Sequence, residues 1–127
     1  MRYDLSVMSI SASKAEVSQR RAADPLEELR RRIKRTVQAL EPEAEIILYG
    51  SRARGDAAAD SDWDLLILVD GPVDAAREQA IRHRLYELEW DSDEVICSVI
   101  CSRLDWNSPL YRAMPFHRNV DHDGIVL

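Results

Sequence analysis

The stretch that decides the fold is LYGSRARGDAAADSDWDLLILVD, Leu48–Asp70. Gly50 and Ser51 follow an apolar run, and ten residues later Asp62 and Asp64 stand one residue apart and lead directly into LLILV. A carboxylate at the mouth of a buried strand costs free energy unless a cation or hydrogen-bond donors compensate its charge. The position of the two aspartates therefore needs a chemical explanation.

Two apolar runs flank the Gly-Ser pair and predict two strands. AEIILY (44–49) precedes it, and DWDLLILVD (62–70) follows it. The second run is almost continuously apolar, which is typical of a strand that is covered on both faces. A third strand is predicted in EVICSVICS (94–102), because this segment is rich in β-branched residues.

Helical patterns surround these strands. One helix begins near Pro25 with Asp24 as its cap. Its apolar residues recur at steps of three and four, at Leu26, Leu29, Ile33, Val37 and Leu40. A second helix runs from Asp74 to about Trp90, with Ile81, Leu85 and Leu88 on its inner side. NSPLYRAM (107–114) and PFHRNVDHDG (115–124) predict two short helical pieces.

The resulting order is helix, strand, strand, helix, strand, helix. It predicts an α/β (α+β) fold, in which a small mixed β-sheet carries helices mainly on one face. We expect residues 1–22 to be a poorly ordered or peripheral leader and residues 23–127 to form one domain.

Composition narrows the functional class. The net charge of −6 argues against nucleic acid as a direct partner. Because the sequence contains no apolar run of membrane-spanning length and no signal-peptide pattern, we expect a cytoplasmic protein with no membrane partner. Cys97 and Cys101 are expected to be reduced thiols, since residues four apart on a strand lie too far apart for a disulfide.

The Asp-x-Asp pair suits a metal ion. Side chains two apart on a strand point to the same face, with Cα atoms roughly 6.5–7 Å apart, so Asp62 and Asp64 converge while Trp63 points away. Two converging carboxylates repel each other unless a cation lies between them. Two carboxylates with phosphate oxygens and water make a typical Mg²⁺ site. By itself, however, an isolated pair of this kind is more often a polar strand entrance.

The Gly-Ser end of the stretch suits phosphate. Gly50 lets the backbone approach a bulky anion, and Ser51 supplies a hydroxyl beside the N–H groups of the following turn. Arg52 and Arg54 flank that turn with guanidinium groups that match phosphate oxygens. One end of the stretch therefore suits a triphosphate, and the other suits its metal ions.

The spacing Gly-Ser, ten residues, Asp-x-Asp resembles the signature of the polymerase-β-like nucleotidyltransferase superfamily. With the short chain, ILYGSRARGDAAADSDWDLLILVD (47–70) is similar to the minimal nucleotidyltransferases that act as antitoxins in HEPN/MNT toxin–antitoxin pairs. The resemblance implies Mg²⁺-dependent transfer of a nucleoside monophosphate, AMP from ATP, to a hydroxyl of a partner protein. It also implies a HEPN-type toxin as that partner and two Mg²⁺ ions at the site.

The resemblance assigns roles to individual residues in the first part of the stretch. Gly50 and Ser51 are expected to hold the β- and γ-phosphates, with help from Arg52 and Arg54. Ser61 is expected to orient the turn or the carboxylates. These five residues form the expected nucleotide-binding set.

Asp62 and Asp64 are expected to be catalytic metal ligands. The family usually adds a third acidic residue on a neighbouring strand, for which Asp91, Asp93 and Glu94 are candidates. Glu94 is preferred because it immediately precedes the third apolar run. The match is imperfect, since the usual residue lies inside the strand.

Two further functions stay open at this stage. The chain is alternatively a catalytically weak antitoxin that acts by stoichiometric binding of its toxin, which the imperfect third carboxylate favours. It is alternatively a small-molecule transferase of the aminoglycoside type, for which a homodimer could build the substrate pocket. The oligomeric state, homodimer or hetero-oligomer, also stays open.

Overall fold

The computed structural model describes residues 24–127, so the expectation for residues 1–22 lies outside the described range. The chain divides into two units, Met1–Arg31 and Arg32–Leu127. Of the first unit, the structure describes the start of helix α2 (Pro25–Leu40). There Asp24 Oδ1 accepts a hydrogen bond of 3.0 Å from the backbone N–H of Leu26, which confirms the predicted helix start.

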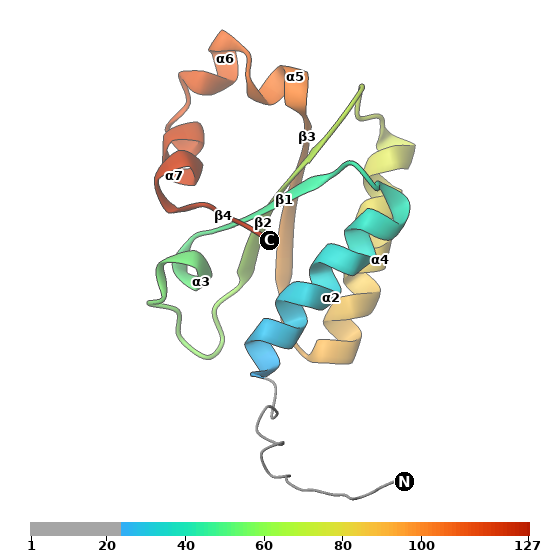
Figure 1. The fold of residues 1–127 in the computed structure, drawn as a ribbon, viewed down its shortest axis with the longest axis vertical. Helices are drawn as coiled ribbons and strands as arrows, with labels where there is room; N and C mark the ends of the chain where they lie inside the picture. The colour runs from blue at the N-terminus through green and yellow to red at the C-terminus, as the bar shows by residue number, and fades with distance from the viewer. Residues whose placement is uncertain (1–23) are drawn as a thin grey trace, which may run out of the picture. The chain divides into compact units, whose positions relative to one another are not determined.

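The second unit contains a four-stranded mixed sheet with the order β3-β2-β1-β4 (Figure 1). Its strands are β1 (Glu45–Tyr49), β2 (Trp63–Val69), β3 (Ile96–Ser102) and β4 (Ile125–Val126). β2 runs antiparallel to β1 and parallel to β3, and β4 pairs antiparallel with β1. The three predicted strands are confirmed. β4 was not predicted, because two residues are too few for a periodic pattern.

Five helices follow α2 in the chain. They are α3 (Ser51–Arg54), α4 (Ala75–Ser92), α5 (Arg103–Trp106), α6 (Pro109–Arg112) and α7 (Pro115–Asp123). Side-chain caps fix several of their starts. Asp74 Oδ1 accepts from the N–H of Arg77 at 2.8 Å to cap α4, while Ser102 and Ser108 cap α5 and α6.

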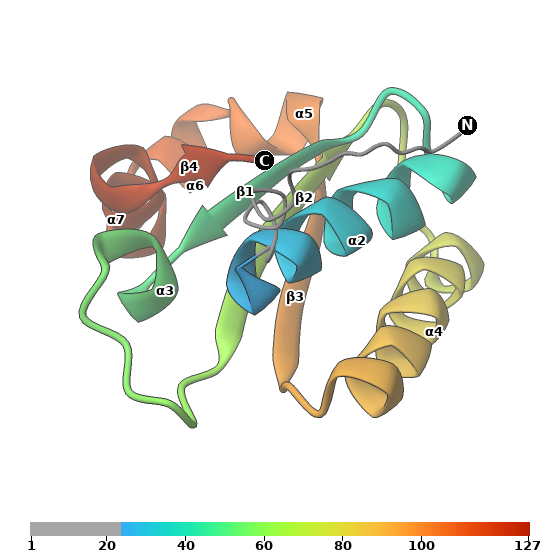
Figure 2. The same cartoon turned by 60° about the horizontal axis from the view of Figure 1, so that its bottom comes forward.

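Helix α4 and the part of α2 from Arg32 onward cover one face of the sheet, as Figure 2 shows. Ile33 and Val37 of α2 are fully buried, and so are the residues of β2 that alternate onto this face, Leu65, Ile67 and Val69. Ile81, Leu85 and Leu88 are the buried residues of α4, as the sequence predicts.

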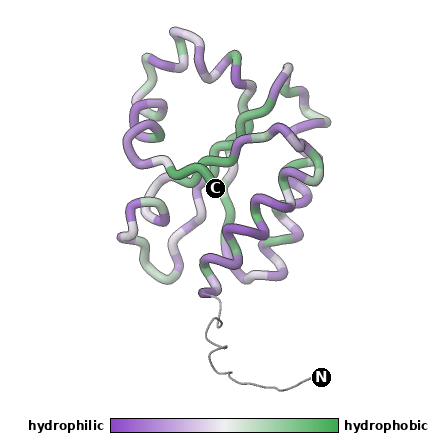
Figure 3. Tube along the Cα trace, viewed as in Figure 1, coloured by the Kyte–Doolittle hydropathy of each residue, from purple (hydrophilic) through white to green (hydrophobic). Residues whose placement is uncertain are grey.

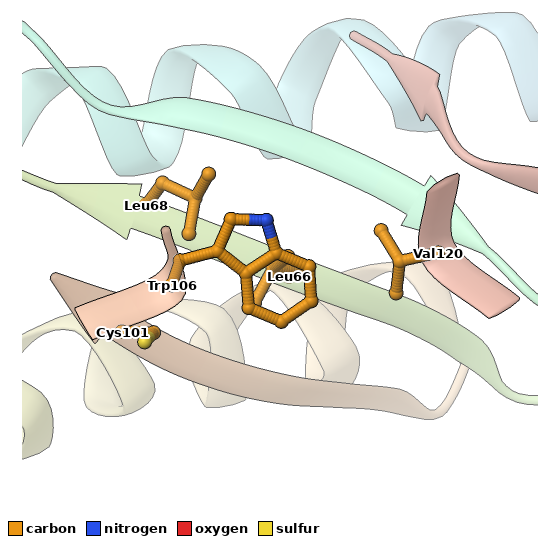
Figure 4. Close-up of a cluster of buried hydrophobic side chains, with 5 residues drawn as sticks. All are labelled: Leu66, Leu68, Cys101, Trp106 and Val120. Atoms are coloured by element: carbon orange, nitrogen blue, oxygen red, sulfur yellow. The ribbon is translucent and has the colours of Figure 1, made fainter. Parts of the chain in front are cut away.

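The short helices cover part of the opposite face. There a buried cluster joins Leu66, Leu68, Cys101, Trp106 and Val120 (Figure 4). The Trp106 ring stacks on His117 with centroids 4.2 Å apart and meets Phe116 edge-on at 5.7 Å. Because β2 is buried on both faces, its near-continuous apolar sequence is explained, and Figure 3 shows the strands as the most hydrophobic part of the trace.

Within the described residues, no helix is long and apolar enough to cross a membrane. Cys97 and Cys101 are both free thiols, the first exposed and the second buried, as expected from their spacing.

Candidate active site

Strand pairing brings the two ends of the Gly-Ser–Asp-x-Asp stretch together. Tyr49, the last residue of β1, pairs with Asp64 in the antiparallel register of β1 and β2. Gly50 and Ser51 follow Tyr49 directly, and Asp62 lies two residues before Asp64. The Gly-Ser turn and both carboxylates therefore lie at the same end of the same strand pair.

Gly50 is in direct contact with Asp64. Its backbone has φ 77° and ψ −159°, a region that only glycine adopts without strain. A Cβ atom placed on Gly50 would lie 2.5 Å from Oδ2 of Asp64. Glycine is thus required here twice, by its conformation and by the carboxylate that lies against it.

The two aspartates share a face, as the strand alternation predicts. Trp63, the residue between them, is 1% exposed and belongs to the core. Asp62 is exposed, and Asp64 is partly buried. The pKa of Asp64 is raised, first by burial and then by the negative charge of Asp62, while Arg54 opposes the shift. The folded protein therefore holds a carboxylate whose charge lacks full compensation.

Arg52 supports the loop between α3 and β2. Its guanidinium donates to the carbonyl of Ser61 at 3.0 and 3.3 Å and to the carbonyl of Ala59 at 3.1 Å. It also lies over the Trp63 ring, 5.0 Å from the centroid. The side chain is only 8% exposed. These contacts hold the loop that precedes Asp62. They use N–H groups of Arg52, a residue that the sequence predicts to assist phosphate binding.

Glu94 contacts both Arg52 and Trp63. Its Oε1 accepts a hydrogen bond from Trp63 Nε1 at 3.1 Å and one from Arg52 Nη2 at 3.4 Å. We call Arg52, Trp63 and Glu94 the loop brace. The role of Glu94 as third metal ligand stays a prediction, and these contacts describe a different role, because they fix an indole and a guanidinium.

The other two candidates for the third carboxylate lie at the end of α4. Asp91 forms an ion pair of 3.2 Å with Arg32 on α2. Asp93 has φ 58° and caps the C-terminus of α4, donating its N–H to the Glu89 carbonyl at 2.9 Å. Asp91 thus pairs with a residue of α2, and Asp93 ends α4.

Ser61 and Arg54 complete the expected nucleotide-binding set. Ser61 Oγ accepts from the N–H of Ala58 at 2.9 Å and so shapes the loop before Asp62. Arg54 forms ion pairs of 3.2 Å with Asp56 and with Asp123 of α7. Its side chain remains 46% exposed, and its role in nucleotide binding stays a prediction.

Cys97 is a site residue that sequence reasoning missed. It pairs with Asp64 in the parallel register of β2 and β3, and its Sγ donates to Oδ2 of Asp62 at 3.4 Å. The pKa of this thiol is raised, first by desolvation and then by the hydrogen bond and charge of Asp62. The signal that could have found it is the register of β3 against β2, which sequence periodicity does not supply.

The donor set at this edge fits magnesium in part. Within residues 24–127, no three His, Cys, Asp or Glu side chains are grouped so that they could hold a metal ion. Two carboxylates on one face still suit Mg²⁺, because this ion is usually bound by one or two carboxylates and takes its remaining ligands from phosphates and water. The chemistry of Asp62 and Asp64 is therefore compatible with Mg²⁺.

Comparison with known proteins shows the family to which this chain belongs. The nucleotidyltransferase domain family matches residues 30–121, well over half of the chain. The chain belongs to this family. The matched segment includes β1, the Gly-Ser turn, both aspartates and β2, and the expected fold class of this nucleotidyltransferase is confirmed.

A solved structure has a similar fold. It is the crystal structure of a toxin–antitoxin with AMP-PNP, and it superposes with a TM-score of 0.56 at 20% sequence identity. The likeness covers 76% of this chain and 69% of that chain, and at this identity it concerns the fold alone. A search of curated proteins finds no match to this nucleotidyltransferase.

The contact between Gly50 and Asp64 predicts that Gly50→Ala destabilises the protein by roughly 2 kcal/mol or more, from backbone strain and the clash with the carboxylate. Gly55→Ala is the matched control, because Gly55 also has positive φ (87°) but nothing within 4 Å of an added Cβ. It should cost only about 1 kcal/mol. Urea unfolding measures both, and Gly50→Ala should cost less in an Asp64→Ala background. Equal costs in the two backgrounds would contradict the contact.

The raised pKa of Asp64 predicts that Asp64→Asn stabilises the metal-free protein at pH 7. A raised folded-state pKa means that the charged form is disfavoured by folding, so removal of the charge raises Tm by a few degrees. The gain should disappear as the pH falls below about 4, where the wild-type carboxyl is protonated in both states. Thermal unfolding in EDTA tests this, with Asp60→Asn in the exposed loop as control. A lower Tm for Asp64→Asn at pH 7 would refute it.

Proposed function

We propose that this protein transfers AMP from ATP to a hydroxyl of a partner protein, with Mg²⁺ held at Asp62 and Asp64. The observation that carries the proposal is the pairing of Tyr49 with Asp64, which brings the Gly50 turn beside the carboxylates in a chain of the nucleotidyltransferase family. This arrangement can receive phosphates on one side and their cation on the other.

The residues of the site would have separate roles in the reaction. Gly50 and Ser51 would receive the β- and γ-phosphates, with the Ser51 hydroxyl as a hydrogen-bond donor to a phosphate oxygen. Asp62 and Asp64 would hold the magnesium ions. When bound, these ions would stabilise the leaving pyrophosphate and activate the attacking hydroxyl. The loop brace would keep Asp62 in place during the reaction, since Arg52 holds the carbonyl of the preceding residue, Ser61.

The transfer exchanges one bond to the α-phosphorus for another. The acceptor oxygen forms a bond to the α-phosphorus of ATP, and the bond from that phosphorus to the bridging oxygen of the β-phosphate breaks. Pyrophosphate leaves with the electron pair, and the proton of the acceptor hydroxyl passes to solvent. The exposed position of Asp62 supports an acceptor that reaches the site from outside the chain.

The partner is proposed to be a toxin of the HEPN type, as the sequence resemblance implies. The similar fold in a toxin–antitoxin crystallised with AMP-PNP supports both a toxin partner and an adenine nucleotide. The present chain would then be the antitoxin, and modification of a toxin hydroxyl would silence the toxin.

One observation favours a second candidate, a catalytically weak antitoxin that neutralises its toxin by stoichiometric binding. Within the described residues the aspartates are not joined by a third acidic ligand, and Glu94 contacts Trp63 and Arg52. Such a site could bind a nucleotide and react slowly.

To test the proposed transfer, the full chain is incubated with its toxin, Mg²⁺ and ATP labelled at the α-phosphate. We expect label on the toxin and equimolar pyrophosphate. Asp62→Asn and Asp64→Asn should each lower the rate by about a hundredfold or more, because each removes a ligand whose charge holds the reacting phosphates. Asp60→Asn, in the same loop, should leave the rate unchanged.

The alternatives predict different results. No label transfer by wild type, with toxin neutralisation intact in the Asp62→Asn/Asp64→Asn double variant, would establish the stoichiometric antitoxin instead. Transfer that proceeds equally in wild type and double variant would overturn the assigned site.

A further inference from the structure

Cys97 lies on β3, the strand that neighbours β2, and it is close to Asp62 and Asp64. The parallel register pairs it with Asp64, and side chains of paired residues on neighbouring strands point to the same face of a sheet. The 3.4 Å contact between its Sγ and Oδ2 of Asp62 shows that the thiol does reach the carboxylates. Of the β3 side chains, this one is placed to take part in the site.

The rest of β3 offers no charge on this face. Val99 and Cys101 alternate onto it after Cys97, and Cys101 is part of the apolar cluster with Leu66 and Leu68. Glu94, two residues before the strand, is engaged by Trp63 and Arg52. Beside Asp64 of β2, and Asp62 just before that strand, β3 therefore presents a neutral thiol and no carboxylate on this face.

We propose that Cys97 determines how this site takes its metal: because it places a neutral group beside Asp62 and Asp64, the cation binds weakly to the free protein and enters together with the nucleotide. The inference rests on the proposed function, since it takes Asp62 and Asp64 as the metal ligands. Cys97 acts as a positioning and specificity-determining residue. It donates its S–H to Asp62 and contributes no charge.

The chemistry of the thiol supports this role over direct ligation. Mg²⁺ selects oxygen ligands, and a protonated sulfur is a poor partner for it. With two protein carboxylates available, the ion must take most of its ligands from phosphates and water. A third negative charge at the position of Cys97 would remove that dependence, because it would attract the ion before any nucleotide arrives.

The test measures Mn²⁺ binding to the full chain without nucleotide, by titration calorimetry and by electron paramagnetic resonance. Cys97→Asp adds the charge, and Cys97→Asn is its matched neutral control. We expect Cys97→Asp to bind Mn²⁺ at least about tenfold more tightly than Cys97→Asn. Wild type and Cys97→Ser should resemble Cys97→Asn. With a non-hydrolysable ATP analogue present, the difference should shrink, because phosphate oxygens then supply ligands to every variant.

Two results would overturn the inference. Equal Mn²⁺ affinity of Cys97→Asp and Cys97→Asn would show that position 97 does not face the cation, and tight binding by wild type that Cys97→Ser abolishes would make the sulfur a ligand. Should Cys97→Asp fail to fold, as judged by circular dichroism, Cys97→Glu replaces it, with Cys97→Gln as its neutral control. Val99→Asp, two residues further along the same face, should tighten binding less.

Failure of the inference and failure of the proposed function are distinguishable. Mn²⁺ binding in the presence of the ATP analogue should be lost in Asp62→Asn/Asp64→Asn. If it is lost while Cys97→Asp and Cys97→Asn bind the free ion equally, only the role of Cys97 is overturned. If it persists in Asp62→Asn/Asp64→Asn, the metal site of the proposed function is overturned as well.

Discussion

The site depends on one backbone pairing, that of Tyr49 with Asp64 between the antiparallel strands β1 and β2. This pairing presses the carboxylate of Asp64 against Gly50, where no larger residue fits. A shift of the register by one residue would send Asp62 and Asp64 into the core and Trp63 to the surface. The register is held by the apolar residues of β2, which are buried on both faces, so the same hydrophobic sequence that builds the core also places the carboxylates.

Much of this fold was predictable because its patterns are local. The alternation around Trp63 predicted the common face of Asp62 and Asp64, and apolar spacing predicted the buried side of α4 at Ile81, Leu85 and Leu88. β4 gave no signal, since a strand of two residues has no period. Its pairing with Ile47 and Leu48 depends on where α7 ends, which is a tertiary property.

The parts of the site that sequence reasoning missed depend on contacts between distant segments. Arg52 is predicted to assist phosphate binding because an arginine beside a Gly-Ser turn suits that chemistry, and this stays a prediction. Its contacts with the loop carbonyls and the Trp63 ring are a further role that the sequence does not indicate. Cys97 came beside Asp62 through the parallel register of β2 and β3. That register is set by the length of the connection through α4 and by packing on both faces of the sheet, and no short window of sequence contains either.

Asp62 and Asp64 lie one on each side of Trp63, a core residue. This placement limits how the sequence of the protein can change in evolution. Their separation is set by the repeat of an extended backbone, a dimension that substitutions in surrounding residues hardly alter. Exposed side chains of α5 and α6, such as Leu104 and Leu110, have no such constraint. The spacing of the two carboxylates would therefore stay constant while exposed residues elsewhere on the surface change.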